Sequence, residues 1–233
     1  MPNSIEYSLV RSRRRSLELR VFPDQRIEVR APLKTCQSEI DRFIASRQSW
    51  LNRTLERMAE RPLPLQPGYQ HGARHPFLGK PLLLSLANAA EKRIAVQGDT
   101  LSIHQPDLAP QAVAASLDRW YRDQARALFE QEIERRFPFF SGRGHSRPTL
   151  RIKRMKSRWG SLSSRGYINL NLALVYYPRV CLEYVVVHEL CHLEHMDHGP
   201  GFKSLITELM PDWRARKSLL NRLPQIIPSA SDD

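Results

Sequence analysis

One apolar stretch constrains the fold of this chain more than any other feature. Residues 184–187 read Tyr-Val-Val-Val, and residues 188–192 read His-Glu-Leu-Cys-His. The stretch is too apolar to face water along a whole helix, so we expect a buried helix here. His188 and His192 are four residues apart and share one face of that helix. The chain must therefore fold around two neighbouring imidazoles.

Two histidines at this spacing, with a glutamate between them, form an H-E-x-x-H motif. Neutral imidazole is a good zinc ligand, and three protein ligands leave one coordination position for water. Glu189 follows the first histidine and can accept a proton from that water, because the metal makes the water acidic. We therefore predict His188 and His192 as metal ligands and Glu189 as the catalytic acid/base.

Two further histidines, His195 and His198, are candidates for the third ligand. His195 falls close to the same helical face as the first two. However, three ligands along one straight helix would spread over about 10 Å, and one ion cannot easily collect them. His198 can approach from another side, because the predicted helix runs to about His195 and breaks at Gly199-Pro200-Gly201. The sequence therefore favours His198.

Charge and cysteine content bear on partners and compartment. The 233 residues include 36 Lys and Arg against 24 Asp and Glu, a net charge of +12. Such a chain favours anionic partners, so nucleotides and nucleic acids enter as candidates beside a polypeptide substrate. Three cysteines at no disulfide-framework spacing indicate a reducing compartment, and we expect the cytoplasm. Without a long apolar run, we expect no membrane partner.

Periodicity predicts an α+β fold whose N-terminal part is rich in strands. Alternating residues predict a hairpin over 16–31 with a turn at Pro23-Asp24-Gln25. An amphipathic helix is expected over 37–60, and prolines end it. The remaining elements of this half are short strands at 82–86, 94–96 and 101–103 and a long helix at 111–137.

The second half has a different pattern. Alternation predicts strands near 150–153 and 167–171, with a loop over 160–166 between them. Three helices follow, the first carrying the histidines and the others near 202–210 and 213–223. We predict an N-terminal hairpin and helix region (1–140), a metal domain (141–225) and a flexible tail (226–233).

The sequence resembles the YgjP-like metallopeptidase family, which is related to the SprT-type zincins. The matching segments are Lys156-Ser157-Arg158-Trp159-Gly160-Ser161, Ile168-Asn169-Leu170-Asn171, Tyr184 to Leu190, His192-Leu193, His198 and Phe202. The most specific are the blocks His188–Phe202 and Lys156–Ser161. The resemblance implies a zinc ion held by His188, His192 and His198, with Glu189 as acid/base, in a zincin-like C-terminal domain. Leu162 departs from the family, which usually has cysteine there, so a thiol has no role at this position.

A basic run adjoins the family motif. It contains no acidic residue and comprises Arg143, Arg147, Arg151, Lys153, Arg154, Lys156 and Arg158. We interpret Lys156 and Arg158 as residues that line the cleft. Asn169 and Asn171 alternate on the strand before the metal helix and can orient a substrate backbone.

Three functions remain open from the sequence. The first is a zinc-dependent metallopeptidase that attacks a peptide bond. The second is a metal-dependent nucleoside triphosphate pyrophosphatase, although phosphoryl chemistry usually uses magnesium held by carboxylates. The third is a basic binding module on nucleic acid, or a protease that acts on DNA-bound proteins. The sequence leaves the oligomeric state undetermined.

Overall fold

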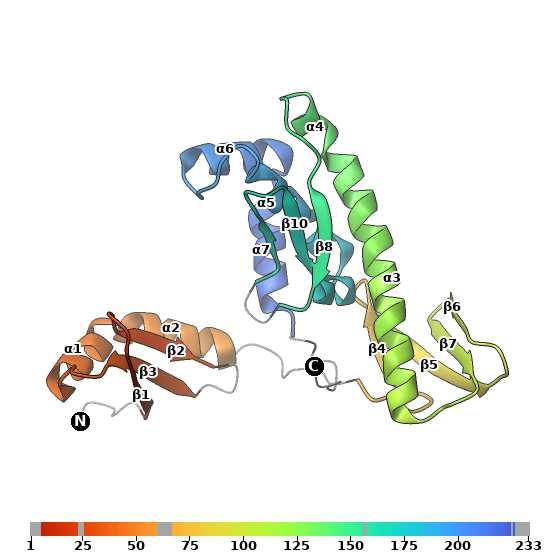
Figure 1. The fold of residues 1–233 in the computed structure, drawn as a ribbon, viewed down its shortest axis with the longest axis horizontal. Coiled ribbons are helices and arrows are strands. Elements are labelled where there is room, and N and C mark those ends of the chain that lie inside the picture. Colours follow the sequence, from red (N-terminus) through yellow and green to blue (C-terminus); the bar gives the residue numbers. More distant parts are fainter. Residues whose placement is uncertain (1–5, 23–25, 60–66, 156–157, 225, 227–233) are drawn as a thin grey trace. The chain divides into compact units, whose positions relative to one another are not determined.

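The fold is α+β, as expected, and the chain divides into two compact units. The computed structural model describes residues 6–22, 26–59, 67–155, 158–224 and 226 (Figure 1). The units are Met1–Leu63 and Pro64–Asp233. Each has its own cluster of buried apolar side chains, and the larger cluster runs from Ala73 to Leu220. This larger cluster contains residues from both sides of position 140. The division into an N-terminal region (1–140) and a metal domain (141–225) therefore stays a prediction.

The first unit combines a three-stranded sheet with two helices. Strands β2 (Glu18–Val21) and β3 (Ile27–Pro32) pair antiparallel, which confirms the hairpin. Its expected turn at 23–25 lies outside the described residues. β1 (Ser8–Ser12), which was not predicted, pairs parallel with the other side of β3. Val29 and Ala31 lie on the same face of β3 and are fully buried, so this face of the central strand packs into the core.

The single helix expected over 37–60 is in fact two helices. α1 (Gln37–Ser46) ends at Arg47, where the backbone leaves the helical region, and α2 (Gln48–Ala59) follows at once. Ile40 and Leu51, one from each helix, are fully buried. The break lets each helix present its own apolar face to the core, which hydrophobic spacing alone does not reveal.

The second unit begins with a four-stranded sheet in the order β4-β5-β7-β6. β5 (Lys80–Asn88), β6 (Arg93–Gln97) and β7 (Thr100–Gln105) confirm the three expected strands. β4 (Arg74–Phe77) was not predicted and pairs antiparallel with β5. β5 and β7 run parallel, and the fully buried Leu84, Leu101 and Ile103 line one face.

The turn between β4 and β5 connects this sheet to the rest of the unit. Leu78 and Gly79 both have positive φ, 49° and 82°, as tight hairpin turns require. Their backbone N–H groups donate to the carbonyls of Val175 and Tyr176 at 2.8 and 3.1 Å. A Cβ on Gly79 would lie 2.8 Å from Pro178 Cγ. The turn therefore rests directly against the start of the helix that carries the histidines.

One long helix extends beside both sheets of this unit. α3 (Pro110–Arg136) has 27 residues, which corresponds to about 40 Å. It starts beside β4 and β5 and ends at the short helix α4 (Pro138–Ser141) near the second sheet (Figure 1). α3 confirms the helix expected over 111–137, and its buried residues belong to the same core as those of both sheets.

The second sheet has the order β8-β10-β9. β8 (Thr149–Lys153) and β10 (Tyr167–Asn171) confirm the two strands expected from alternation, and they pair in parallel, which was not predicted. The expected loop over 160–166 is wrong at its start, because β9 (Gly160–Leu162) pairs antiparallel with β10 at the sheet edge. Small and polar residues concealed this strand, and only its pairing with β10 defines it.

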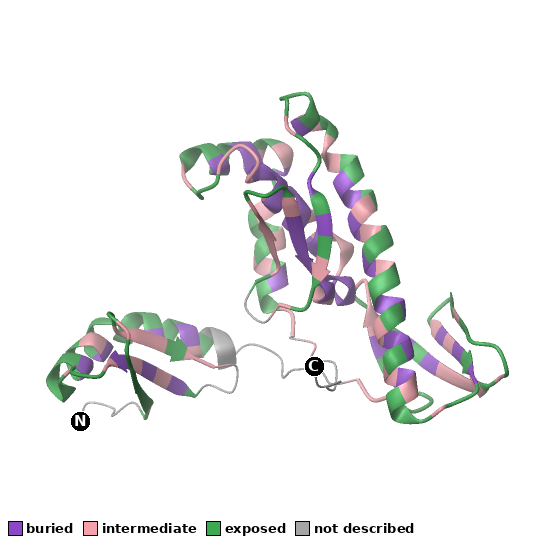
Figure 2. Ribbon diagram, in the orientation of Figure 1, coloured by how far each residue is buried: buried purple, intermediate pink, exposed green. Residues whose placement is uncertain are grey.

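The C-terminal helices complete the unit. The 3-10 helix η1 (Leu172–Tyr176) leads from β10 into α5 (Arg179–Cys191), followed by α6 (Pro200–Leu209) and α7 (Trp213–Arg222). Most of α5 is buried, as its apolar sequence predicts (Figure 2). Of the predicted tail 226–233, residues 227–233 lie outside the described part of the chain.

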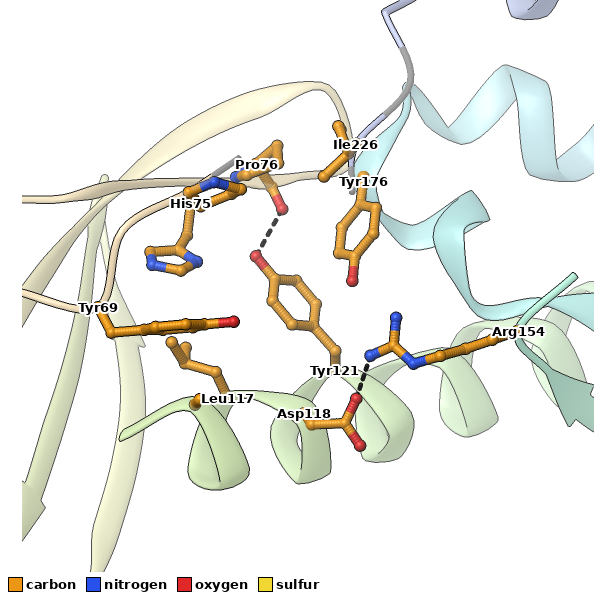
Figure 3. A pocket seen from close by; sticks show the side chains of 11 residues that line it. Tyr69, His75, Pro76, Leu117, Asp118, Tyr121, Arg154, Tyr176 and Ile226 are labelled. Carbon is orange, nitrogen blue, oxygen red and sulfur yellow. Dashed lines mark hydrogen bonds and ion pairs between the residues drawn. The ribbon is translucent and has the colours of Figure 1, made fainter. Parts of the chain in front are cut away.

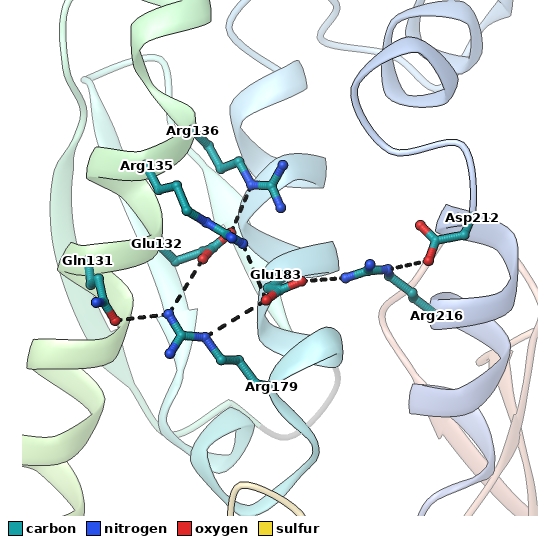
Figure 4. Close-up of polar contacts among 8 residues, drawn as sticks. All are labelled: Gln131, Glu132, Arg135, Arg136, Arg179, Glu183, Asp212 and Arg216. Atoms are coloured by element: carbon teal, nitrogen blue, oxygen red, sulfur yellow. Dashed lines mark hydrogen bonds and ion pairs between the residues drawn. The ribbon is translucent and has the colours of Figure 1, made fainter.

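An ion-pair network connects α3, α5 and α7 (Figure 4). The fully buried Glu132 accepts hydrogen bonds from Arg135 at 2.8 Å and Arg136 at 2.9 Å. Glu183 of α5 pairs with Arg135 at 3.2 Å and with Arg216 of α7 at 2.5 Å. Two helices, α3 and α7, are thus fixed against α5, the element that positions the histidines.

Candidate metal centre

The helix α5 ends earlier than expected, and this sets the geometry of the site. The α-helix stops at Cys191, and His192 is its C-cap. The helix expected through about His195 is therefore wrong at its end, because residues 193–198 form a turn. A Cβ on Gly201 would lie 2.7 Å from Cε1 of the His195 imidazole, so that ring lies against the start of α6.

Three imidazoles converge where α5 meets this turn. One nitrogen from each of His188, His192 and His198 lies within 4.8 Å of the others. The Nε2 atoms of His188 and His198 are 3.0 Å apart. Two nitrogens bound to one tetrahedral zinc at 2.0–2.1 Å would lie roughly 3.3 Å apart. The spacing of these two rings thus suits a shared cation.

Phe202, near the start of α6, holds the three rings in place. Its ring centroid lies 4.9 Å from those of His188 and His192 and 4.7 Å from that of His198. Its side chain is buried, so it also closes the apolar side of the cluster. Sequence reasoning treated Phe202 as a core residue, and nothing in its spacing indicated contact with all three imidazoles.

The protonation states of the rings suit metal binding. His192 Nδ1 lies 2.8 Å from the His195 carbonyl oxygen. A carbonyl can only accept, so Nδ1 carries a proton and Nε2 is the nitrogen left to bind a cation. Burial, together with the neighbouring His192 and His198, lowers the pKa of His188 to about 3. Burial also lowers the pKa of His198. Neutral imidazoles are the form that binds zinc, so the donor set fits a divalent transition metal.

Glu189 lies beside the histidines with its carboxylate against β9. It is 5% exposed, and burial raises its pKa to about 7. A hydrogen bond from the Leu162 backbone and the charge of Arg158 act in the opposite direction. A Cβ at position 160 would lie 2.6 Å from Glu189 Oε1, so the carboxylate occupies space that only a glycine leaves free. The contacts of Gly160 and Leu162 with Glu189 were not predicted, because both residues lie in the segment 160–166 that was interpreted as a loop.

The four predicted substrate residues have different surroundings. Lys156 lies outside the described residues. Arg158 is exposed and close enough to Glu189 to lower its pKa. Asn169 donates to the Ser161 carbonyl at 3.2 Å, and Asn171 donates to the carbonyls of Met155 and Arg158 at 2.8 and 3.0 Å. Both asparagines are buried, so their described contacts are with this chain.

Much of the basic run is engaged within the protein. Arg147 pairs with Glu130 and Arg154 with Asp118. Arg143 lies 3.2 Å from Glu194, and the guanidinium of Arg151 lies 3.3 Å from the centroid of the Tyr167 ring. Most of these cations therefore have partners, which weakens the case for a continuous row of phosphate ligands.

A pocket lies elsewhere in the second unit (Figure 3). Rings of Tyr69, Tyr121 and Tyr176 line it, and the Asp118–Arg154 ion pair lies at one side. The Tyr121 hydroxyl donates to the Pro76 carbonyl at 2.8 Å. None of the lining residues belongs to the histidine cluster. The pocket therefore belongs to the junction between α3, β4 and η1.

Among the described helices, none combines the length and apolar character needed to cross a membrane.

Comparisons with known proteins identify the family. A search of curated proteins gives no match. Among solved structures, the chain is similar to the crystal structure of the metallopeptidase zymogen of Pyrococcus abyssi abylysin. Identity is 21% and the TM-score 0.36, over 42% of this chain and 99% of the other. The model of the YgjP-like metallopeptidase domain matches residues 15–223. A metallopeptidase domain implies a metal-dependent hydrolase that acts on polypeptides, and this chain belongs to the YgjP-like metallopeptidase family.

Proposed function

We propose that the protein is a zinc-dependent peptidase whose metal is held by His188, His192 and His198 and whose general base is Glu189. The observation that carries the proposal is the convergence of three imidazole nitrogens beside a buried carboxylate. In this proposal residues 141–225 act as a zincin-like metal domain with the H-E-x-x-H helix at its centre. The odd number of cysteines supports a reducing compartment, the cytoplasm.

The donor set supports zinc over harder metals. Three neutral imidazoles suit zinc, whereas magnesium and calcium prefer oxygen ligands. Family membership implies a divalent metal without fixing its identity. When bound, the cation supplies Lewis acidity that polarises the scissile carbonyl and lowers the pKa of water.

Glu189 moves the proton in this proposal. Its carboxylate is held between the histidines and β9, where the Leu162 backbone N–H donates to it. A carboxylate in this position accepts a proton from the attacking water and passes it to the leaving amine. The buried position excludes bulk water, so the proton stays at this oxygen between the two steps.

An extended polypeptide suits the edge strand β9. Asn171 N–H donates to the Trp159 carbonyl, and Ser163 N–H donates to the Tyr167 carbonyl. Backbone groups alternate sides along an antiparallel strand, so Gly160 and Leu162 direct theirs away from β10. Together with family membership, the outward-facing backbone groups of this edge that Glu189 does not engage support a polypeptide substrate added as a further strand.

We keep Lys156, Arg158, Asn169 and Asn171 as proposed substrate residues. Arg158 is exposed beside Glu189, so it can contact substrate directly. Asn171 acts through the Met155 and Arg158 carbonyls that it binds. In this way it positions the segment that carries Arg158.

The Glu189→Gln variant tests the function. We expect it to lose peptide hydrolysis by about 100-fold or more, because a general base contributes that much. Zinc binding should persist, since no ligand changes. The zinc-loaded protein and this variant would be assayed on a peptide library and a nucleotide panel. Pyrophosphate release from a nucleoside triphosphate, with no peptide cleavage, would replace the peptidase by the pyrophosphatase.

Nucleic-acid binding is a separate measurement. Affinity that falls steeply with salt, together with no peptide cleavage by the zinc-loaded wild type, would favour a binding module over this enzyme.

A further inference from the structure

We propose that Gly160 is a positioning residue for Glu189, because its missing side chain leaves the space that the Glu189 carboxylate occupies beside β9. The inference rests on the proposed function for its catalytic meaning. Its structural content, a steric coupling between positions 160 and 189, can be tested without any substrate.

The contact at Gly160 is specific to one side chain. An ideal Cβ built there would lie 2.6 Å from Oε1, 2.7 Å from Cγ and 2.9 Å from Cδ of Glu189, and these are its three nearest heavy atoms. Real Cβ atoms essentially never approach other atoms so closely. Any larger residue at 160 must therefore displace the glutamate or β9.

The backbone of Gly160 gives no other reason for a glycine. The glycines of the described residues with positive φ are Gly72, Gly79, Gly98, Gly144 and Gly166, and Gly160 is not among them. An L-residue can therefore adopt its conformation without strain. Within β9 it pairs with Leu170, which is fully buried. The requirement for glycine thus comes from the space needed by Glu189.

A second contact on the same strand completes the arrangement. The Leu162 backbone, two residues along β9, hydrogen-bonds the Glu189 carboxylate. β9 therefore limits Glu189 in two ways, by a close approach at 160 and by a donor at 162. A carboxylate fixed in this manner loses little rotamer entropy when a substrate binds. Displacement of about 1 Å would be enough to cost ~100-fold in rate.

The Gly160→Ala variant tests the coupling first through stability. Urea unfolding of the metal-free protein would be measured for Gly160→Ala in three backgrounds: wild type, Glu189→Gln and Glu189→Ala. Glutamine keeps the size of glutamate, so we expect alanine at 160 to lower the midpoint in the first two. In Glu189→Ala the contacting atoms are gone, so the midpoint should stay or rise slightly, as exchange of an unstrained glycine for alanine predicts.

The same variant tests positioning through catalysis. We expect Gly160→Ala to lower kcat by roughly 100-fold with KM and zinc affinity little changed. Glu189→Asp is shorter by one methylene, so combining it with Gly160→Ala should cost less than the product of the two single effects. Gly142→Ala is the matched control, because a Cβ there meets its nearest atoms at ordinary distances of 3.6 and 3.8 Å.

Two results would overturn the inference. One is equal destabilisation by Gly160→Ala in the wild-type and Glu189→Ala backgrounds. The other is full kcat in Gly160→Ala while Glu189→Gln is inactive. If Glu189→Gln itself keeps full peptidase activity, the proposed function fails. The urea midpoints of Gly160→Ala in the three Glu189 backgrounds still test the steric coupling in that case.

Discussion

At the scale of single residues, the site depends on imidazoles that are neutral and correctly turned. His192 is oriented by the main-chain carbonyl of residue 195, while His188 is neutral because it is buried beside two other histidines. Phe202 contacts all three rings and limits their rotation. All three rings thus share a packing contact with Phe202, and His192 has a hydrogen bond to a main-chain carbonyl in addition.

The two candidates for the third ligand give opposite predictions. His198→Ala should weaken zinc binding by at least ~100-fold, since even partners outside the ligand set contribute 10–100-fold. His195→Ala should leave affinity within a few-fold, because its contribution to His192 is a main-chain carbonyl. Competition with a chromophoric chelator measures both. Equal losses in the two variants would contradict this assignment.

His75 predicts a pH dependence of stability. It is 2% exposed, its Nε2–H donates to the Gly68 carbonyl at 2.8 Å, and burial lowers its pKa. The unfolded chain therefore binds a proton at higher pH than the folded chain does. The free energy of unfolding that depends on neutral His75 is therefore fully present above about pH 6.5. It is lost as the pH falls below that value, because the unfolded chain then binds the proton first.

The matched variant for this effect is His75→Gln, which keeps a donor but does not titrate. The free energy of unfolding of the metal-free wild type should fall more steeply from about pH 7 to pH 5 than that of His75→Gln. Urea titrations at several pH values measure the difference. Parallel pH profiles would show that His75 does not contribute.

At the scale of elements, α5 is held on several sides. α3 and α7 reach it through the Glu132 and Glu183 network, the β4–β5 turn contacts its start, and β9 contacts Glu189. A helix so constrained keeps the spacing of His188 and His192 fixed. The elements around α5 are therefore part of the site.

Glu132 should contribute strongly to stability. We expect Glu132→Ala to lower the free energy of unfolding by about 2–3 kcal/mol, because removal of a buried partner leaves arginines without their carboxylate. The cost stays below that of a fully buried pair, since Arg135 and Arg136 reach solvent. Glu134→Ala on the same helix is the control, because its side chain is 71% exposed and should change stability by less than about 0.5 kcal/mol.

At the scale of the whole molecule, the two units have separate cores. No residue is shared between the larger cluster and the cluster of Val29, Ala31, Ile40 and Ile44. We therefore expect a fragment of residues 64–233 to unfold cooperatively and to bind zinc as tightly as the full chain. Thermal unfolding by circular dichroism and zinc titration measure this. A fragment that is unfolded, or that binds zinc 10-fold more weakly, would show dependence on the first unit.

The sequence predicted those parts of the site that are contiguous. His188, Glu189 and His192 were found because helical spacing relates them, and His198 because the chain must turn before it. The contacts of Gly160, Leu162 and Phe202 were missed, since they arise only when β9 and α6 pack on α5. Likewise β1 and β4 lacked clear alternation and are defined by their pairing partners. Local pattern thus reaches the proposed ligands but not the residues that pack against them.

The hydrogen bond from His192 to the peptide group of residue 195 has a consequence for how this sequence can diverge. Orientation by a main-chain oxygen is insensitive to the identity of the amino acid that supplies it. Point changes at 195 can therefore accumulate during evolution without disturbing the ring, whereas an inserted or deleted residue between 192 and 198 would misdirect it. Selection on the segment between His192 and His198 therefore acts more on its length than on the identity of its residues.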